Sequence, residues 1–114
     1  QSIASSMGGS CELDIKVAYP TLYNDPALTA RARSWAAAYL GTENVVELPI
    51  RMTAEDFAYY SQRMPACFFR LGTGNIAKGI TSPIHTNTFD IDEAALKVGM
   101  GLMAWLGVQE VASS

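Results

Sequence analysis

The chain contains one histidine, His85, which lies in the stretch Ser-Pro-Ile-His-Thr-Asn-Thr-Phe-Asp-Ile-Asp-Glu of residues 82–93. An imidazole can act as a general base near neutral pH, or it can bind zinc and similar transition metals. A base needs a carboxylate or carbonyl partner that fixes its tautomer, and a metal site needs two or three further ligands. Because the sequence holds no second histidine, His85 taken alone is more typical of an exposed polar residue in a loop.

Two adjacent acids, Glu55 and Asp56, are the second candidates for chemistry. Thr53 followed three positions later by Asp56 resembles a capping box, and acids in the first turn of a helix complement its dipole. Neighbouring residues on a helix point about 100° apart, so one acid can complete the cap while the other faces a site. The spacing alone favours the capping interpretation.

A glycine turn and two cysteines carry weaker signals. Gly72-Thr-Gly-Asn75 follows an apolar run, but a dinucleotide fingerprint needs a third glycine and a P-loop needs Gly-Lys-Ser/Thr, so we predict a turn. Cys11 and Cys67 are too few and too widely spaced for a disulfide framework or a zinc knuckle. We expect reduced thiols that pack as small buried hydrophobes in a cytoplasmic protein.

These candidate residues are set in a chain whose patterns alternate between strand and helix. Residues 12–19 alternate apolar and polar side chains, which is typical of a half-buried strand. Asp25 before Pro26 predicts the start of a helix, which Gly41 ends. The other expected elements are a strand at 45–50, a helix from Thr53 to about Arg63, a strand at 66–71, and a helix from Ile91 to about Leu106 with Asp90 and Glu93 in a capping pattern. This order predicts a layered α/β fold, with the last helix, apolar on every side, buried between layers.

The composition limits the classes of partner. A length of 114 residues allows one core, and eight basic against eleven acidic side chains, without a basic run, argue against a nucleic-acid partner. The longest apolar run, residues 94–108, is interrupted by glycine and lysine and is shorter than the roughly 20 residues of a membrane span. The N-terminus has neither an initiator methionine nor a signal peptide, so we expect a cut end. With 49% apolar and only 17% charged residues, part of the surface is expected to contact a partner.

Three ordered blocks of the sequence resemble one family. They are residues 52–60 (Met-Thr-Ala-Glu-Asp-Phe-Ala-Tyr-Tyr), residues 64–75 (Met-Pro-Ala-Cys-Phe-Phe-Arg-Leu-Gly-Thr-Gly-Asn) and residues 85–99, which begin His-Thr-Asn-Thr-Phe-Asp-Ile-Asp-Glu. Together they resemble the C-terminal part of the metal-dependent aminoacylase and carboxypeptidase family, in the branch of hippurate hydrolases, N-acyl-amino-acid amidohydrolases and indoleacetyl-amino-acid hydrolases. The resemblance covers the chain from about Glu12 onward.

The resemblance implies a division of the chain into parts of two domains. In that family a layered, zinc-peptidase-like α/β domain is interrupted by a smaller α+β lid domain that also mediates dimerisation. Residues 1–22 would then be the end of the lid domain, with its last strand at 12–19 and a hinge. Residues 23–114 would be the C-terminal part of the metal-binding catalytic domain.

The resemblance also implies a role for His85 as the last ligand of a site for two divalent metal ions. The other ligands and the glutamate general base would come from an N-terminal part that this sequence does not contain. Glu55 and Asp56 match a motif near the site and would support it, and Gly72 and Asn75 would lie on its substrate side. The ions would be zinc or manganese, with nickel or cobalt as alternatives, and this chain alone would bind neither ion tightly.

Two features depart from the family pattern. The Ser-Pro or Asn-Pro that commonly follows the ligand histidine is Thr86-Asn87 here, which removes a rigid turn. Cys11 and Cys67 both fall outside the position of the family's metal-binding cysteine. Neither cysteine can therefore be assigned as a ligand.

The implied activity is hydrolysis of the amide bond of a small N-acyl amino acid or a similar conjugate by a metal-activated water. We expect the 114-residue chain alone to be inactive, because it supplies one ligand of a site that needs several. The alternative is a non-enzymatic binding or assembly module that keeps the family fold. Either interpretation predicts a homo-oligomer that binds neither nucleic acid nor membrane.

Overall fold

The computed structural model describes residues 2–16 and 18–113. In chain order the helices are α1 (Ser2–Ser6), α2 (Pro26–Leu40), the 3-10 turn η1 (Thr42–Asn44), α3 (Ala58–Ser61), the 3-10 turn η2 (Ile76–Lys78) and α4 (Ala94–Ser113). Within those residues no strand is formed, and the only sheet-like pairing is an isolated antiparallel bridge between Asn75 and Ile80. The described part of the chain is therefore helical, with long irregular connections.

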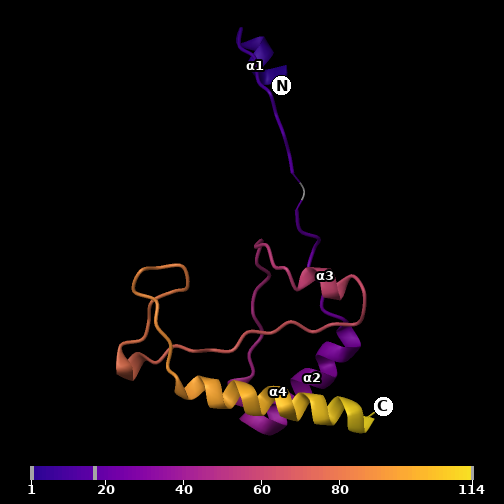
Figure 1. The fold of residues 1–114 in the computed structure, drawn as a ribbon, viewed down its shortest axis with the longest axis vertical. Helices are drawn as coiled ribbons and strands as arrows, with labels where there is room; N and C mark the ends of the chain where they lie inside the picture. The colour runs from indigo at the N-terminus through magenta and orange to yellow at the C-terminus, as the bar shows by residue number, and fades with distance from the viewer. Residues whose placement is uncertain (1, 17, 114) are drawn as a thin grey trace.

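The molecule is open and flat. Its radius of gyration is 20.1 Å and it extends over 63 × 41 × 19 Å, whereas a compact domain of this size has a radius of gyration of about 13 Å. Figure 1 shows why: α1 lies at the far end of an extended trace that leaves the rest of the structure. Contacts with α3 begin at residue 18, where the carbonyl of Ala18 accepts a hydrogen bond from the Tyr59 hydroxyl.

The two long helices, α2 and α4, pack against each other, and they cross in Figure 1. The Trp105 indole donates a hydrogen bond from Nε1 to the Trp35 carbonyl over 2.9 Å, and its ring stacks on Tyr39 at a centroid distance of 6.1 Å. An ion pair of 2.7 Å joins Arg31 to Glu110 on the same side. These contacts connect residues some 70 positions apart and fix the orientation of α4.

Helix α2 begins and ends where the sequence predicts. The Asp25 carboxylate accepts a hydrogen bond from the Leu28 amide over 2.8 Å, Pro26 occupies the first turn, and Gly41 takes φ 91° just after the last residue. A side-chain acceptor at the cap satisfies an amide that has no partner within the helix, and a glycine tolerates a positive φ. The predicted helix is thus confirmed at both ends.

Removing this cap has a measurable effect. Asp25→Ala is expected to lower the free energy of unfolding by about 1 kcal/mol, because the Leu28 amide loses its acceptor. Urea denaturation followed by circular dichroism measures the change. Asp25→Asn keeps an acceptor oxygen and is expected to recover most of the loss, and equal destabilisation by both variants would contradict the assignment.

The predicted strands are not formed in the described residues. Segments 12–16 and 18–19, 45–50 and 66–71 all lack strand structure, so the predicted strands and the layered sheet are not confirmed in the described residues. A strand needs a neighbouring strand to satisfy its amides and carbonyls. In segment 66–71 the partners come from residues 24 and 25 and not from a strand: the Asn24 side-chain amide donates to the Phe68 carbonyl at 2.9 Å and accepts from the Phe68 amide at 2.8 Å, and the Asp25 amide donates to the Ala66 carbonyl at 2.8 Å.

Two helix boundaries differ from prediction. Helix α3 starts at Ala58 without a side-chain cap, so the capping box expected at Thr53 is wrong; the Glu55 carboxylate instead accepts from the Phe57 amide at 3.3 Å. Helix α4 starts at Ala94, not Ile91, because the Asp92 carboxylate accepts from the Ala94 amide at 3.2 Å. It continues to Ser113, seven residues beyond the predicted end, since nothing after Leu106 but Gly107 disfavours a helix.

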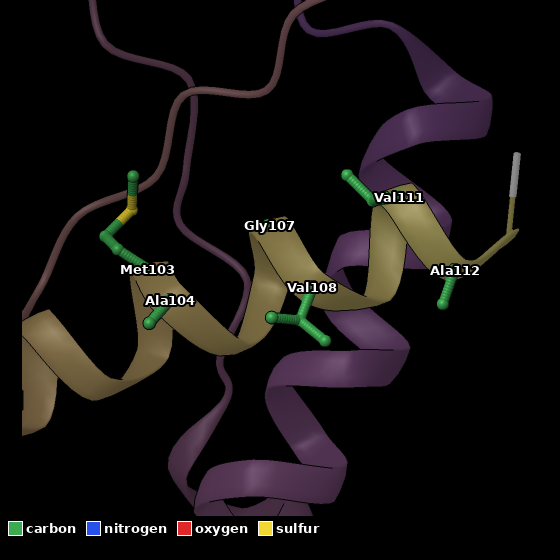
Figure 2. Close-up of a pocket in the computed structure, with 6 residues that line it drawn as sticks. All are labelled: Met103, Ala104, Gly107, Val108, Val111 and Ala112. Carbon is green, nitrogen blue, oxygen red and sulfur yellow. The ribbon is translucent and has the colours of Figure 1, made fainter.

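Little of the apolar surface is covered in the described residues. Ala58, Ala66 and Leu102 are the buried apolar residues, so the expectation that α4 lies buried between layers is not met by this chain. Figure 2 shows a shallow apolar groove along the C-terminal half of α4, lined by Met103, Ala104, Gly107, Val108, Val111 and Ala112. Among the described helices, none is both long and apolar enough to cross a membrane.

Candidate metal-ligand loop

His85 lies in a loop that closes on itself. The hydroxyls of Ser82 and Thr88 are 2.8 Å apart at its two ends, and the Thr86 hydroxyl donates to the Pro83 carbonyl over 2.8 Å. Figure 1 shows this segment as a closed ring that projects from the body. We name residues 82–88 the histidine loop.

The backbone of His85 is in the left-handed region, with φ 67°, and its side chain is exposed. It is the one positive-φ residue other than glycine in the described residues. Histidine, like asparagine, adopts this conformation more readily than most residues do. The result is an accessible imidazole at the far end of a self-bonded loop, which can accept a proton or donate a lone pair to a metal.

His85 is one candidate metal ligand, and the described residues do not provide a complete set of ligands. Among residues 2–16 and 18–113, no group of three or more His, Cys, Asp or Glu side chains could hold a metal ion. The described residues therefore fit an ion only through a single candidate ligand, and any further ligands would have to come from outside them. The thiols add no further ligand. Both cysteines were expected to be buried; Cys67 is half-buried, whereas Cys11 is exposed, so the expectation is wrong for Cys11.

The acids predicted to support the site lie elsewhere. Glu55 uses its carboxylate on the Phe57 amide, and Asp56 is exposed beside the start of α3. Figure 1 shows α3 and the histidine loop on opposite sides of the view, so the described structure does not bring these acids to His85. Their supporting role stays a prediction.

Gly72 and Asn75, both predicted to lie on the substrate side, are the two ends of the expected glycine turn, and the Asn75 side chain is already hydrogen-bonded. Gly72 is exposed, and a Cβ added there would meet no neighbouring atom. The chain turns further on, at Gly79, which has φ 74°. Asn75 donates from Nδ2 to the Asp92 carboxylate over 2.6 Å and accepts from the Lys78 amide over 3.2 Å. In this chain Asn75 therefore contacts the start of α4.

Asp92 is the residue that the sequence did not single out. Its carboxylate accepts hydrogen bonds from Lys78 Nζ at 2.7 Å, Asn75 Nδ2 at 2.6 Å and the Ala94 amide at 3.2 Å. These partners, with Lys78 the largest contributor, lower the pKa of Asp92 to about 2. The only signal in the sequence was a third acid beside Asp90 and Glu93, which spacing alone cannot distinguish from a helix cap.

Comparison with known proteins places the chain in a family. The family model described as peptidase family M20/M25/M40 matches residues 3–106. The chain is 35% identical over 109 residues to thermostable carboxypeptidase 1 of Saccharolobus solfataricus, and 33% identical over 109 residues to thermostable carboxypeptidase 2 of the same organism. Each match covers 95% of this chain and 27% of the relative.

A plant relative extends the comparison. The chain is 34% identical over 86 residues to IAA-amino acid hydrolase ILR1-like 4 of Arabidopsis thaliana, a match that covers 75% of this chain and 20% of that protein. No solved structure gives a significant match. The chain thus spans about a quarter of the length of these curated relatives. The resemblance found in the three sequence blocks is confirmed, and the chain belongs to the peptidase family M20/M25/M40.

Proposed function

We propose that the chain forms part of a metal-dependent hydrolase that cleaves the amide bond of N-acyl amino acids or similar small conjugates. The exposed imidazole of His85, held at the tip of a self-closed loop, carries this proposal. Membership of a peptidase family supports hydrolysis, and relatives named carboxypeptidase and IAA-amino acid hydrolase support an amide as the scissile bond. His85 would bind one of two divalent ions.

Divalent ions held with the help of His85 would supply a water of lowered pKa and a Lewis acid for the scissile carbonyl. His85 would contribute an imidazole nitrogen, which suits zinc, manganese, nickel or cobalt. The histidine loop projects from the body in Figure 1 and the His85 side chain is exposed, so ligands from outside the described residues could complete the site. Glu55, Asp56 and Gly72 are proposed to support the site or its substrate once those parts are assembled.

The domain arrangement is proposed on the same basis. Residues 1–22 would belong to a lid and dimerisation domain, and residues 23–114 to a layered α/β catalytic domain whose strands 12–19, 45–50 and 66–71 pair with partners beyond this chain. Figure 1 supports the division, because the segment that carries α1 leaves the body that holds α2, α3 and α4. A cytoplasmic location and a homo-oligomer complete the proposal.

The 114-residue chain alone is expected to be inactive. One imidazole cannot hold a metal tightly, because a catalytic site needs about three protein ligands. The purified chain, supplied with zinc or manganese and hippurate or an acetyl-amino acid, should release no more product than a protein-free control. The natural gene product that carries this chain should hydrolyse such a substrate and lose the activity on treatment with a chelator. Metal-dependent turnover by the chain alone would contradict this expectation.

The exposed apolar surface favours a second candidate, a non-enzymatic assembly module. Large apolar side chains remain open along α4, among them Met100, Met103 and Val111, and monomers rarely expose extended apolar patches. A module would form dimers or larger assemblies and show no metal-dependent hydrolysis in the natural gene product. Light scattering and the same activity assay therefore distinguish the two candidates.

A further inference from the structure

The ends of the histidine loop meet the rest of the chain at one polar cluster. The histidine loop lies within residues 81–91, the segment between Ile80 and Asp92. Asn75 contacts both of these residues: its backbone exchanges two hydrogen bonds of 2.9 Å with Ile80, and its side chain donates to the Asp92 carboxylate at 2.6 Å. One residue thus ties together the start and the end of the segment that carries His85.

Asp92 makes more contacts than a helix cap requires. A cap needs only the bond from the Ala94 amide, which Oδ1 accepts at 3.2 Å. The same carboxylate also accepts from Lys78 Nζ at 2.7 Å and from Asn75, and the Asp92 amide donates to the Thr73 carbonyl at 2.8 Å. The side chain of Asp92 is 15% exposed, while that of Lys78 is 57% exposed, so the ion pair lies at the surface with its carboxylate partly covered.

The cluster is cross-linked internally. Asn75 Oδ1 accepts from the Lys78 amide at 3.2 Å, and Gly79 at φ 74° turns the chain back so that Ile80 can pair with Asn75. The turn at 75–80 and the start of α4 therefore form one hydrogen-bonded unit at the base of the segment that carries His85. We name Asn75, Lys78 and Asp92 the loop clamp.

We propose that Asp92, acting through Asn75 and Lys78, is a positioning residue that fixes both ends of the histidine loop and thereby the place of the His85 imidazole. The inference rests on the proposed function, in which His85 is a metal ligand. A ligand that is already in place when the ion arrives loses less conformational freedom on binding. The lowered pKa of Asp92 agrees with this role, since the carboxylate stays charged and keeps its partners over the whole neutral range.

The test measures zinc affinity of the natural gene product by competition with a chelator, with zinc alone as the probe. Asp92→Ala is expected to weaken zinc binding about 10-fold, at the lower end of the range for residues that orient a ligand from outside the first coordination sphere. Asp90→Ala is the matched control, because it removes the same charge two positions away and its carboxylate accepts only from the adjacent Ile91 amide in the described residues. That control should bind zinc as the unmodified protein does.

A swap separates positioning from simple capping. Asn75→Asp combined with Asp92→Asn restores an amide–carboxylate pair with the roles exchanged, and it is expected to recover zinc affinity to within about threefold of the unmodified protein, while Asp92→Asn alone does not. If Asp92→Ala prevents folding, Lys78→Gln removes one clamp bond from a side chain that is 57% exposed and leaves the α4 cap intact. It should weaken zinc binding by about threefold.

The outcomes are distinguishable. Unchanged zinc affinity in both Asp92→Ala and Lys78→Gln, or a swap no better than Asp92→Asn, overturns the positioning role while the function of His85 stands. Unchanged zinc affinity in His85→Asn overturns the proposed function itself, and with it this inference. Loss of affinity in Asp92→Ala, retention in Asp90→Ala and recovery in the swap support it.

Discussion

Replacing His85 by asparagine is expected to lower metal-dependent hydrolysis by the natural gene product at least about 100-fold. Residues that only orient a metal ligand cost about 10–100-fold when they are changed, so loss of the ligand itself should reach or exceed the upper value. Zinc affinity should fall with activity, because the imidazole contributes to holding the ion and not to binding the acyl amino acid. Chelator competition and initial rates at saturating substrate measure the two effects separately.

Asparagine is the informative substitution because of the backbone at this position. His85 has φ 67°, and asparagine tolerates that conformation where alanine does not. His85→Asn therefore removes the imidazole and keeps the loop, whereas His85→Ala removes both. Comparison of the two variants separates ligand loss from a change of loop shape.

A neighbouring residue supplies the control. Asn87 is exposed and forms no hydrogen bond with the described part of the chain. Asn87→Ala should leave zinc affinity and activity within about threefold of the unmodified protein, because it removes an exposed side chain from the same loop and keeps the imidazole. Full activity in His85→Asn would show that the ions bind elsewhere.

The features that the sequence predicted correctly depend on neighbours within a few residues. Asp25, Pro26 and Gly41 define α2 because a cap bonds an amide three positions on, and a glycine ends a helix by its own conformational freedom. Such signals act through the backbone nearby, and no distant segment is needed to complete them. That is why α2 has its predicted bounds although little of the chain is buried.

The features that the sequence did not predict depend on distant partners. Residues 66–71 have the pattern of a strand, but alternation reports only which faces are apolar, and the ladder partner must come from elsewhere. In the described residues the side chain of Asn24 takes part of that role for Phe68, from 44 positions away. A single sequence without an alignment gives no sign of such a pair.

The candidate site shows the same difference between what the sequence predicts and what depends on distant partners. The role of His85 was predicted from the resemblance of residues 85–99 to a family. Spacing could not predict it, because one histidine does not define a set of metal ligands. Asp92 was missed because its partners Asn75 and Lys78 precede it by 17 and 14 residues, with the histidine loop between them. Its assignment needed the fold of the turn at 75–80.

The second large effect is expected at the contact between the two long helices. Trp105→Ala should lower the free energy of unfolding of this chain by about 2–4 kcal/mol, because the ring is half-buried and its loss leaves a cavity against α2. The change removes the stacking on Tyr39 and leaves the Trp35 carbonyl without its indole donor. Since domains are stable by only about 5–15 kcal/mol, a large share of the folded population would be lost.

Two matched variants test whether this loss comes from the interface. Trp105→Phe keeps an aromatic ring against Tyr39 and loses the indole donor, so it should cost about 1 kcal/mol. Met103→Ala changes a residue of the same helix that is 60% exposed, and it should stay within about 0.5 kcal/mol of the unmodified chain. Urea denaturation followed by far-ultraviolet circular dichroism gives all three values. If Trp105→Ala cost no more than Met103→Ala, α4 would not be held by α2, and the start of α4 at Ala94 would have to be placed by the loop clamp alone.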